Sequence, residues 1–336
     1  MKKLLIAGAA LALITSCNMK NPLLTESSAP FGAPQFDKIQ NEHYLPAFEA
    51  GIAEAKAEID AIIANEEEPT FENTIEAMEY AGETLNNVAG IFYNLMEANT
   101  NDQMQQIAEE LSPMLTEYSM YVSLNEGLFE RVKAVYEKKD ELGLEQDQMT
   151  LLDDNYKSFV RGGANLSPED KTLYSKWSEE LSLATLAFGK NVLAATNAYT
   201  LHITDPAQLA GLPEFVRTMA AETASDKGLE GWAFTLDAPS YGPFLKYSTN
   251  RELRKQIWMA YNTRAIGGEN DNTEIVKKIV DLRIKIANIL GYETYADYAL
   301  EERMAKNKKT VDEFVMQLLK PSMEFAKKDV ADVLAY

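Results

Sequence analysis

The feature that most constrains the fold of this chain is a dense series of helix start and stop signals between residues 239 and 307. Thr249 and Glu252 have the spacing of a capping box, in which a hydroxyl and a carboxylate satisfy the free amides of a first helical turn. Thr273 begins a run whose apolar residues recur every three or four positions, and Gly291 follows as a left-handed C-terminal cap. The spacing predicts consecutive amphipathic helices over this region.

Similar signals extend the helical prediction along most of the chain. Helical spacing of apolar residues predicts a helix from His43 to Ala64, and Ser167 followed by Pro168 is a strong start signal for another. Asn73 and Glu76 have the spacing of a cap for a helix that runs toward Leu95.

Alternation of apolar and polar residues occurs in only two stretches, Tyr199 to Thr204 and Trp232 to Leu236. Alternation of this kind is typical of short β-strands with one buried face. The sequence therefore predicts a mainly α fold with a small β-hairpin element.

Composition narrows the class of protein. Hydrophobic residues make up 46% and charged residues 25% of the 336 positions, which are values of a globular chain and exclude a disordered one. The formal net charge of −20 argues against nucleic acid as a partner, because polyanions are bound through Lys and Arg. We interpret the acidity as solvated helix faces, with a preference for cationic peptides as the alternative.

The N-terminus has the layout of an export signal. Lys2 and Lys3 precede an apolar run from Leu4 to Ile14, which is too short to span a bilayer. Ile-Thr-Ser-Cys then resembles a bacterial lipoprotein box ending at Cys17, the only cysteine of the chain. We expect residues 1–16 to be a signal peptide, Cys17 to be lipidated, and residues 17–34 to be a flexible tether. An ordinary signal peptide with a chance cysteine is the alternative. The first interpretation predicts an exported lipoprotein of a bacterial envelope, either facing the periplasm or held in the outer membrane.

A set of short motifs occurs in order between Gly32 and Tyr336. The main ones are Pro69-Thr70-Phe71-Glu72-Asn73-Thr74-Ile75-Glu76, Arg161-Gly162-Gly163-Ala164-x-Leu166, Leu209-Ala210-Gly211-Leu212-Pro213, Pro239-x-Tyr241-x-Pro243, Asn250-Arg251-Glu252-Leu253-Arg254 and Ala260-Tyr261-x-x-Arg264. In this order they resemble the M3 family of zinc metallopeptidases. His43-Tyr44-x-Pro46-Ala47-Phe48 is most similar to the peptidyl-dipeptidase branch, and the oligopeptidase branch is the alternative.

The resemblance implies a fold and an activity. Residues 35–336 would be the helical N-terminal half of a neurolysin-like metallopeptidase that hydrolyses oligopeptides, and Tyr241, Tyr261 and Arg264 would line its peptide channel. In this family two His and a downstream Glu hold zinc, and the Glu of His-Glu-x-x-His activates the bound water. We expect these groups to lie beyond residue 336, in a C-terminal half that would be the partner of this chain.

Inside the chain itself the sequence offers no catalytic residue and no metal ligand. His43 and His202 are the only histidines and neither begins His-Glu-x-x-His, whereas a zinc site takes three or four protein ligands. Adjacent acidic pairs project about 100° apart on a helix and are expected on solvated faces. These pairs are Asp153-Asp154, Glu179-Glu180 and Glu301-Glu302. The chain alone should therefore be inactive, and the competing interpretation is a non-catalytic helical lipoprotein that binds peptides or a protein partner.

Overall fold

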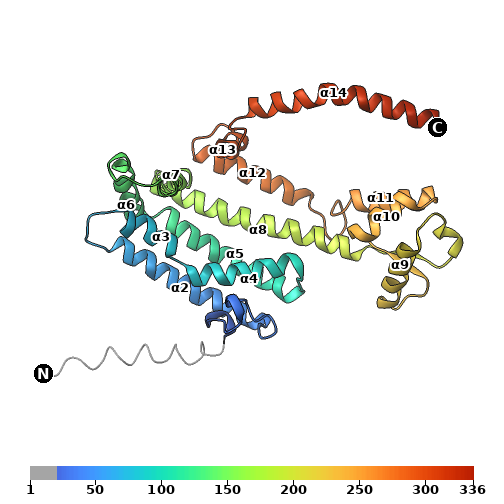
Figure 1. Cartoon of the computed structure of the whole chain (residues 1–336), viewed down its shortest axis with the longest axis horizontal. Coiled ribbons are helices and arrows are strands. Elements are labelled where there is room, and N and C mark those ends of the chain that lie inside the picture. The colour runs from blue at the N-terminus through green and yellow to red at the C-terminus, as the bar shows by residue number, and fades with distance from the viewer. Residues whose placement is uncertain (1–20) are drawn as a thin grey trace. The chain divides into compact units, whose positions relative to one another are not determined.

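The computed structural model describes residues 21–336 and shows a mainly α-helical chain (Figure 1). Two compact units make up the chain: one contains the described residues up to Glu180 together with Leu282–Tyr336, and the other is Leu181–Asp281. The expected signal peptide and Cys17 lie outside the described residues. No helix among residues 21–336 combines the length and the apolar character needed to cross a bilayer.

The helices and strands have the following bounds. The chain up to residue 198 contains α2 (Tyr44–Ile63), α3 (Ala77–Tyr80), α4 (Glu83–Ala98), α5 (Asp102–Ser123), α6 (Glu126–Glu137), α7 (Gln146–Arg161) and α8 (Pro168–Ala198). The remainder contains β1 (Leu201–Ile203), α9 (Glu214–Asp226), β2 (Trp232–Phe234), α10 (Ala238–Tyr247), α11 (Arg251–Asn262), α12 (Thr273–Ile289), α13 (Tyr295–Glu301) and α14 (Lys308–Ala335).

The first unit is organised around α2, which packs against α4, α5 and α6. Tyr44 and Phe48 on α2 meet Phe92 of α4 edge-on, with ring centroids 4.9 and 5.6 Å apart. All three side chains are buried. Burial of each large apolar side chain contributes about 1.5–3 kcal/mol, so this aromatic group is a main source of stability for the helix pair. The helix predicted from His43 to Ala64 is confirmed as α2.

The helix predicted from Asn73 toward Leu95 is interrupted, and this correction has a local cause. Thr70, not Asn73, is the N-cap: its hydroxyl accepts from the Asn73 amide at 3.1 Å, while the Asn73 side chain accepts from the Thr70 amide at 2.9 Å. After one wide π-helical turn, α3 ends at Tyr80 and Gly82 adopts a left-handed φ of 79° before α4 begins. A left-handed residue cannot continue a right-handed helix, and so two helices replace the predicted one.

The second unit contains both predicted strands. β1 and β2 pair antiparallel, with Leu201 opposite Phe234 and Ile203 opposite Trp232. Helix α9 lies between the strands in sequence, so the two antiparallel strands are joined through a helix and not by the tight turn of the expected hairpin. Phe234 packs against Phe244 of α10 with ring centroids 4.6 Å apart, which holds α10 on the sheet.

Helix caps in the second half of the chain agree with the sequence in part. The Thr294–Asp297 capping box is confirmed, and Gly291 is left-handed at φ 90°. At α11 the predicted cap is wrong by one residue: the Asn250 side chain accepts from the Leu253 amide at 3.2 Å, while the Thr249 hydroxyl donates to the Ala210 carbonyl at 3.0 Å.

The segment before α2 is fixed to the body at its start. Asn21 is buried, and its side-chain amide donates to the carbonyl oxygen of His43 at 2.9 Å. Two short 3₁₀ turns follow, at Pro22–Leu24 and Pro30–Gly32. The described part of the segment expected to be a tether therefore begins with a buried, hydrogen-bonded residue.

Candidate functional site

The two histidines do not form a metal site in this structure. His43 lies before α2, where its Nδ1 accepts from the Gln40 amide at 3.0 Å. His202 lies on β1 in the other unit, where its Nε2 donates to the Glu230 carbonyl at 2.6 Å. Among residues 21–336 no three His, Cys, Asp or Glu side chains are grouped so that they could hold a metal ion. The described residues therefore do not fit the zinc that the family resemblance implies.

The three residues expected to line a peptide channel come together in the second unit. Tyr241 of α10 and Tyr261 of α11 are stacked, with ring centroids 4.1 Å apart and planes inclined by 14°. Arg264 lies just after α11 and covers the other face of this stack, with its guanidinium carbon 3.8 Å from the Tyr261 centroid. We name these three side chains the Tyr–Tyr–Arg stack. Whether it lines a peptide channel stays a prediction.

Hydrogen bonds fix the position of the guanidinium in the stack. Nε of Arg264 donates to the Tyr261 carbonyl at 2.9 Å, and Nη1 donates to the Thr196 hydroxyl at 3.2 Å. A guanidinium carries five N–H groups in a rigid plane, so these two bonds leave donors for a further acceptor. The stack can therefore present the guanidinium cation and the edges of the tyrosine rings to a peptide without a change in side-chain conformation.

A polar hollow of about 360 Å³ adjoins this stack. Thr196, whose hydroxyl accepts from Arg264, lines the hollow. The Tyr241 amide donates to the carbonyl of Asp237, which also lines it. The remaining lining residues are Asn197, Thr223, Asp226, Lys227 and Thr235. Hydroxyl, amide and charged groups on one concave surface suit a polar ligand, such as a peptide backbone. Sequence reasoning missed this hollow, because its residues come from three separate segments with no shared motif.

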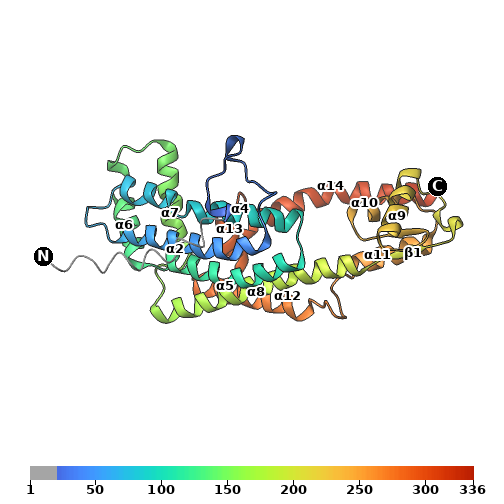
Figure 2. The same cartoon turned by 90° about the horizontal axis from the view of Figure 1, so that it is seen from below.

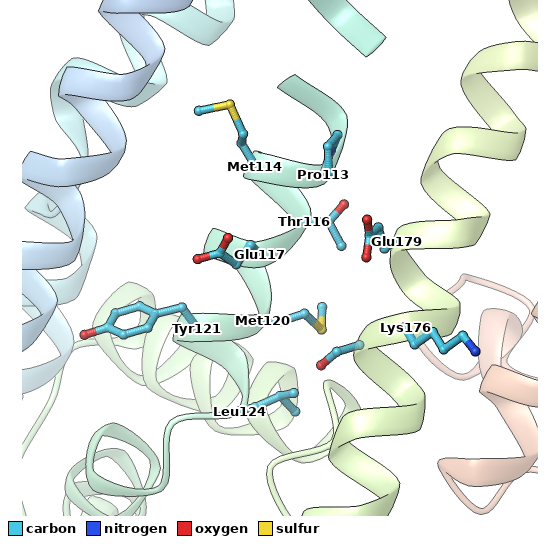
Figure 3. Close-up of a pocket in the computed structure, with 10 residues that line it drawn as sticks. Pro113, Met114, Thr116, Glu117, Met120, Tyr121, Leu124, Lys176 and Glu179 are labelled. Atoms are coloured by element: carbon cyan, nitrogen blue, oxygen red, sulfur yellow. The ribbon is translucent and has the colours of Figure 1, made fainter. Parts of the chain in front are cut away.

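A larger hollow of about 630 Å³ lies in the first unit between α5 and α8 (Figure 3). Met114 and Met120 of α5 supply apolar surface together with Leu124 just after it, while Lys176 and Glu179 belong to α8. Its other lining residues are Pro113, Thr116, Glu117, Tyr121 and Ser175. The two methionines line an open surface and do not fill a core. Met adapts to irregular apolar ligands, so the hollow can accept varied side chains.

Arg161, at the end of α7, ties that helix to α13. Its Nη1 donates to the Tyr292 hydroxyl at 3.1 Å and its Nη2 donates to the Tyr298 carbonyl at 2.9 Å. It forms an ion pair with Glu301, which also accepts from the Tyr292 hydroxyl at 2.6 Å. Glu301 is thus part of a structural network, as Asp153 is through its ion pair with Lys139.

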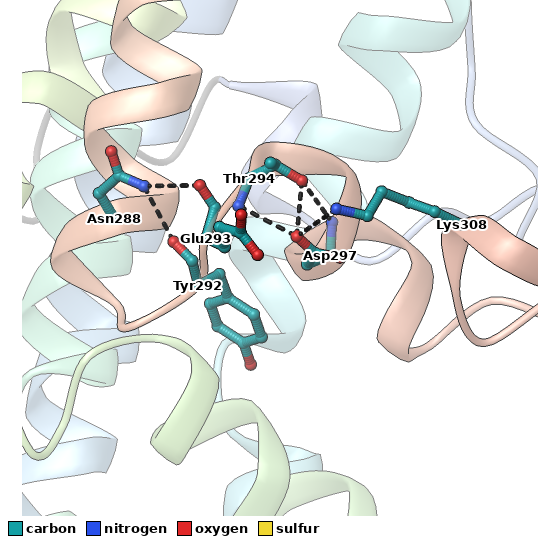
Figure 4. Close-up of polar contacts among 6 residues, drawn as sticks. All are labelled: Asn288, Tyr292, Glu293, Thr294, Asp297 and Lys308. Carbon is teal, nitrogen blue, oxygen red and sulfur yellow. Dashed lines mark hydrogen bonds and ion pairs between the residues drawn. The ribbon is translucent and has the colours of Figure 1, made fainter.

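A second polar group joins α13 to the start of α14 (Figure 4). Nζ of Lys308 lies 3.0 Å from an Asp297 carboxylate oxygen, which also accepts from the Thr294 hydroxyl at 2.7 Å. Hydrogen bonding by Thr294, and next Lys308, lowers the pKa of Asp297 below its usual range. The carboxylate is therefore ionised at neutral pH, and it fixes the point at which α14 begins.

Helix α14 buries none of its residues in this structure. Ten large apolar side chains along it are exposed: Phe314, Val315, Met316, Leu318, Leu319, Met323, Phe325, Val330, Val333 and Leu334. An exposed apolar surface of this extent marks an interaction site in a soluble protein.

Comparison with known proteins matches residues 244–336 to Peptidase family M3. The chain is 35% identical over 317 residues to dipeptidyl carboxypeptidase of Escherichia coli, an alignment that covers 94% of this chain and 46% of that protein. Oligopeptidase A of Escherichia coli is 31% identical over 323 residues, with 95% and 47% covered. The organellar oligopeptidase A of Arabidopsis thaliana is 29% identical over 323 residues, with 94% and 40% covered.

The alignments run through both units and through the motifs quoted above, and the chain spans about half the length of the relatives it matches. Its helical architecture agrees with the fold expected from those motifs. The chain belongs to peptidase family M3.

Proposed function

We propose that this chain is the N-terminal, substrate-enclosing part of a zinc-dependent peptidase that releases dipeptides from the C-termini of oligopeptides. The observation that carries the proposal is the 35% identity to dipeptidyl carboxypeptidase over 94% of the chain. Oligopeptidase A, at 31%, is the nearest alternative in substrate preference.

Under this proposal the described residues bind and enclose the peptide. The Tyr–Tyr–Arg stack supports this role because its rings are held rigidly and its guanidinium retains free donors for a peptide carbonyl or carboxylate. Tyrosine side chains supply rigid contact area for a peptide with little loss of conformational entropy. Residues 21–336 supply no metal ligand set, so zinc and the groups that activate water would come from polypeptide that this sequence does not include.

The same polypeptide would cover α14. Burial of each large apolar side chain of this helix contributes about 1.5–3 kcal/mol. A surface that covers the exposed side chains would therefore stay packed on α14 through apolar contacts alone. The partner that we propose is the C-terminal half of the same protein. Substituting Leu318→Glu should weaken this association, while Lys320→Glu on the polar side of α14 serves as the matched control.

We further propose that the protein is exported and held at a membrane through lipid on Cys17. Its support is the sequence Ile-Thr-Ser-Cys after a short apolar run. Stable anchoring needs more than one acyl chain or a second attachment. Replacing Cys17 with Ser should release the exported protein into the soluble fraction, and retention on membranes would contradict the anchor.

Peptide hydrolysis tests the catalytic proposal directly. The native gene product, purified from its source, is incubated with a synthetic oligopeptide that has a free C-terminus, and products are identified by mass spectrometry. We expect successive loss of C-terminal dipeptides that a zinc chelator abolishes, and no cleavage by the 336-residue chain even with added zinc. Internal cleavage would assign the oligopeptidase preference. Hydrolysis by the 336-residue chain would contradict the location of the zinc site.

A further inference from the structure

Phe31 lies at the tip of a turn. Its ring is exposed to solvent and its backbone is in a conformation that is unfavourable for a residue with a Cβ. Its side chain is 107% exposed relative to an extended reference, which means that it packs against nothing. Its φ of 61° is in the left-handed region, where a residue with a Cβ is sterically disfavoured, and Gly32 beside it has a φ of 67°. Among residues 21–336, folding accounts neither for the aromatic ring nor for its strained backbone at this position.

Hydrogen bonds close the turn and present Phe31 outward. The Ser27 hydroxyl donates to the Ala33 carbonyl at 2.6 Å, and the Gly32 amide donates to the Ala29 carbonyl at 3.1 Å. Figure 2 shows the deep-blue segment that contains this turn as a loop projecting from the helices of the first unit. Phe36, five residues later, is also 53% exposed. The result is a defined projection with two aromatic rings in solvent.

The sequence places this projection close to the proposed anchor. Only three residues separate Cys17 from Asn21, and Asn21 is fixed to the body through the His43 carbonyl. Because an extended chain spans at most about 3.6 Å per residue, a lipid on Cys17 would hold Asn21 within roughly 14 Å of the lipid headgroups. The surface around the start of α2 would then face the membrane.

We propose that the Phe31 turn inserts into the lipid headgroup region and forms a second, non-covalent attachment that orients the anchored protein. This inference rests on the proposed lipidation of Cys17. Interfacial segments commonly bury Phe and Leu side chains at the boundary between headgroups and acyl chains. Glu26, Asp37 and Glu42 outnumber Lys38 in the segment from residue 21 to residue 43, so attraction to anionic lipid does not drive the contact. The contact is apolar and therefore insensitive to salt.

The single cysteine of the chain makes the test clean. Once Cys17 is acylated it offers no thiol, so in the 336-residue chain, which is used for this test, Ala33→Cys places one labelling site beside Phe31. The exported Ala33→Cys protein is labelled with an environment-sensitive fluorophore, reconstituted into phosphatidylcholine vesicles, and exposed to nitroxide groups on the acyl chains. The same label is introduced at Phe215→Cys, an exposed position on α9, as the control, and also in an Ala33→Cys/Phe31→Ser double variant. Mass spectrometry of the N-terminal peptide reports acylation independently.

We expect the label at residue 33 to be blue-shifted and at least twofold more quenched than the label at residue 215, with no change between low and high salt. Phe31→Ser should reduce that quenching toward the control. An acylated protein whose label at residue 33 stays as water-exposed as the control would overturn the inference while leaving the anchor and the peptidase proposal intact. An unacylated Cys17 would overturn the anchor and, with it, this inference, without bearing on peptide hydrolysis.

Discussion

Arg161 provides the sharpest test of how the first unit holds α13 in place. Substituting Arg161→Met keeps the length of the side chain and removes the donors to the Tyr292 hydroxyl and the Tyr298 carbonyl, together with the Glu301 ion pair. A hydrogen bond from a charged donor contributes about 1.5–3 kcal/mol, and an unsatisfied carbonyl costs about 1–3 kcal/mol. These contributions overlap, and water reaches the half-exposed Glu301, so we expect a net loss of about 2–4 kcal/mol.

Hydrogen exchange measures this loss locally, because α13 can open without global unfolding. Since about 1.4 kcal/mol corresponds to a factor of ten, amide protection in α13 should fall by roughly 30- to 1000-fold, with α2 unchanged. Arg303→Met is the matched control, because Arg303 is exposed just beyond the end of α13. Protection in α13 that falls less than about threefold, or falls equally in both variants, would refute the argument that Arg161 holds the helix.

Three further predictions concern stability. Gly211→Ala should destabilise the second unit by more than about 2 kcal/mol in denaturant titration. Gly211 has a φ of +86°, and the added Cβ would lie 2.3 Å from the Tyr247 carbonyl oxygen. The control Gly228→Ala, at a φ of +67° with open space around it, should cost about 1 kcal/mol. Asn250→Ala should cost about 1 kcal/mol through loss of the α11 cap, measured by thermal unfolding. Burial raises the pKa of Tyr174 from 10.0 to about 12, so the stability contributed by its neutral phenol is present below pH 10 and is lost as pH rises toward 12; Tyr174→Phe should flatten that part of the stability profile.

The sequence predicted where helices lie more accurately than which residue caps them. At α11, Thr249 and Asn250 are adjacent and both side chains can accept from a first-turn amide, so spacing alone could not choose between them. The Thr249 hydroxyl is used elsewhere, on the Ala210 carbonyl 39 positions away, and this leaves Asn250 to cap the helix. The long-range hydrogen bond between Thr249 and Ala210 therefore decides which residue caps α11, and the spacing of residues within the helix cannot predict that bond.

In the candidate site, too, the sequence predicted local features better than long-range contacts. The family motifs identified Tyr241, Tyr261 and Arg264 together, and the structure stacks them because α10 and α11 pack against each other. Thr196, which bonds the same guanidinium, is 68 positions away at the end of α8 and carries no recognisable motif. Residues that are joined by one helix pair can be found from sequence, whereas the walls of a hollow depend on how separate segments pack.

The width of the apolar surface of α14 indicates a helix that is covered on more than one side. At about 100° per residue its large apolar side chains occupy a sector of roughly 200°, whereas a helix on the surface of a globular protein needs an apolar stripe of about 100°. Lys320, Glu324 and Lys327 occupy the remaining side. Pairing with a second copy along one seam, or lying flat on a lipid surface, would cover about half of that sector and leave Leu319 or Phe325 in water. Cover from two directions is what the interior of a folded polypeptide supplies, and this geometry supports our proposal that a further part of the same polypeptide covers α14.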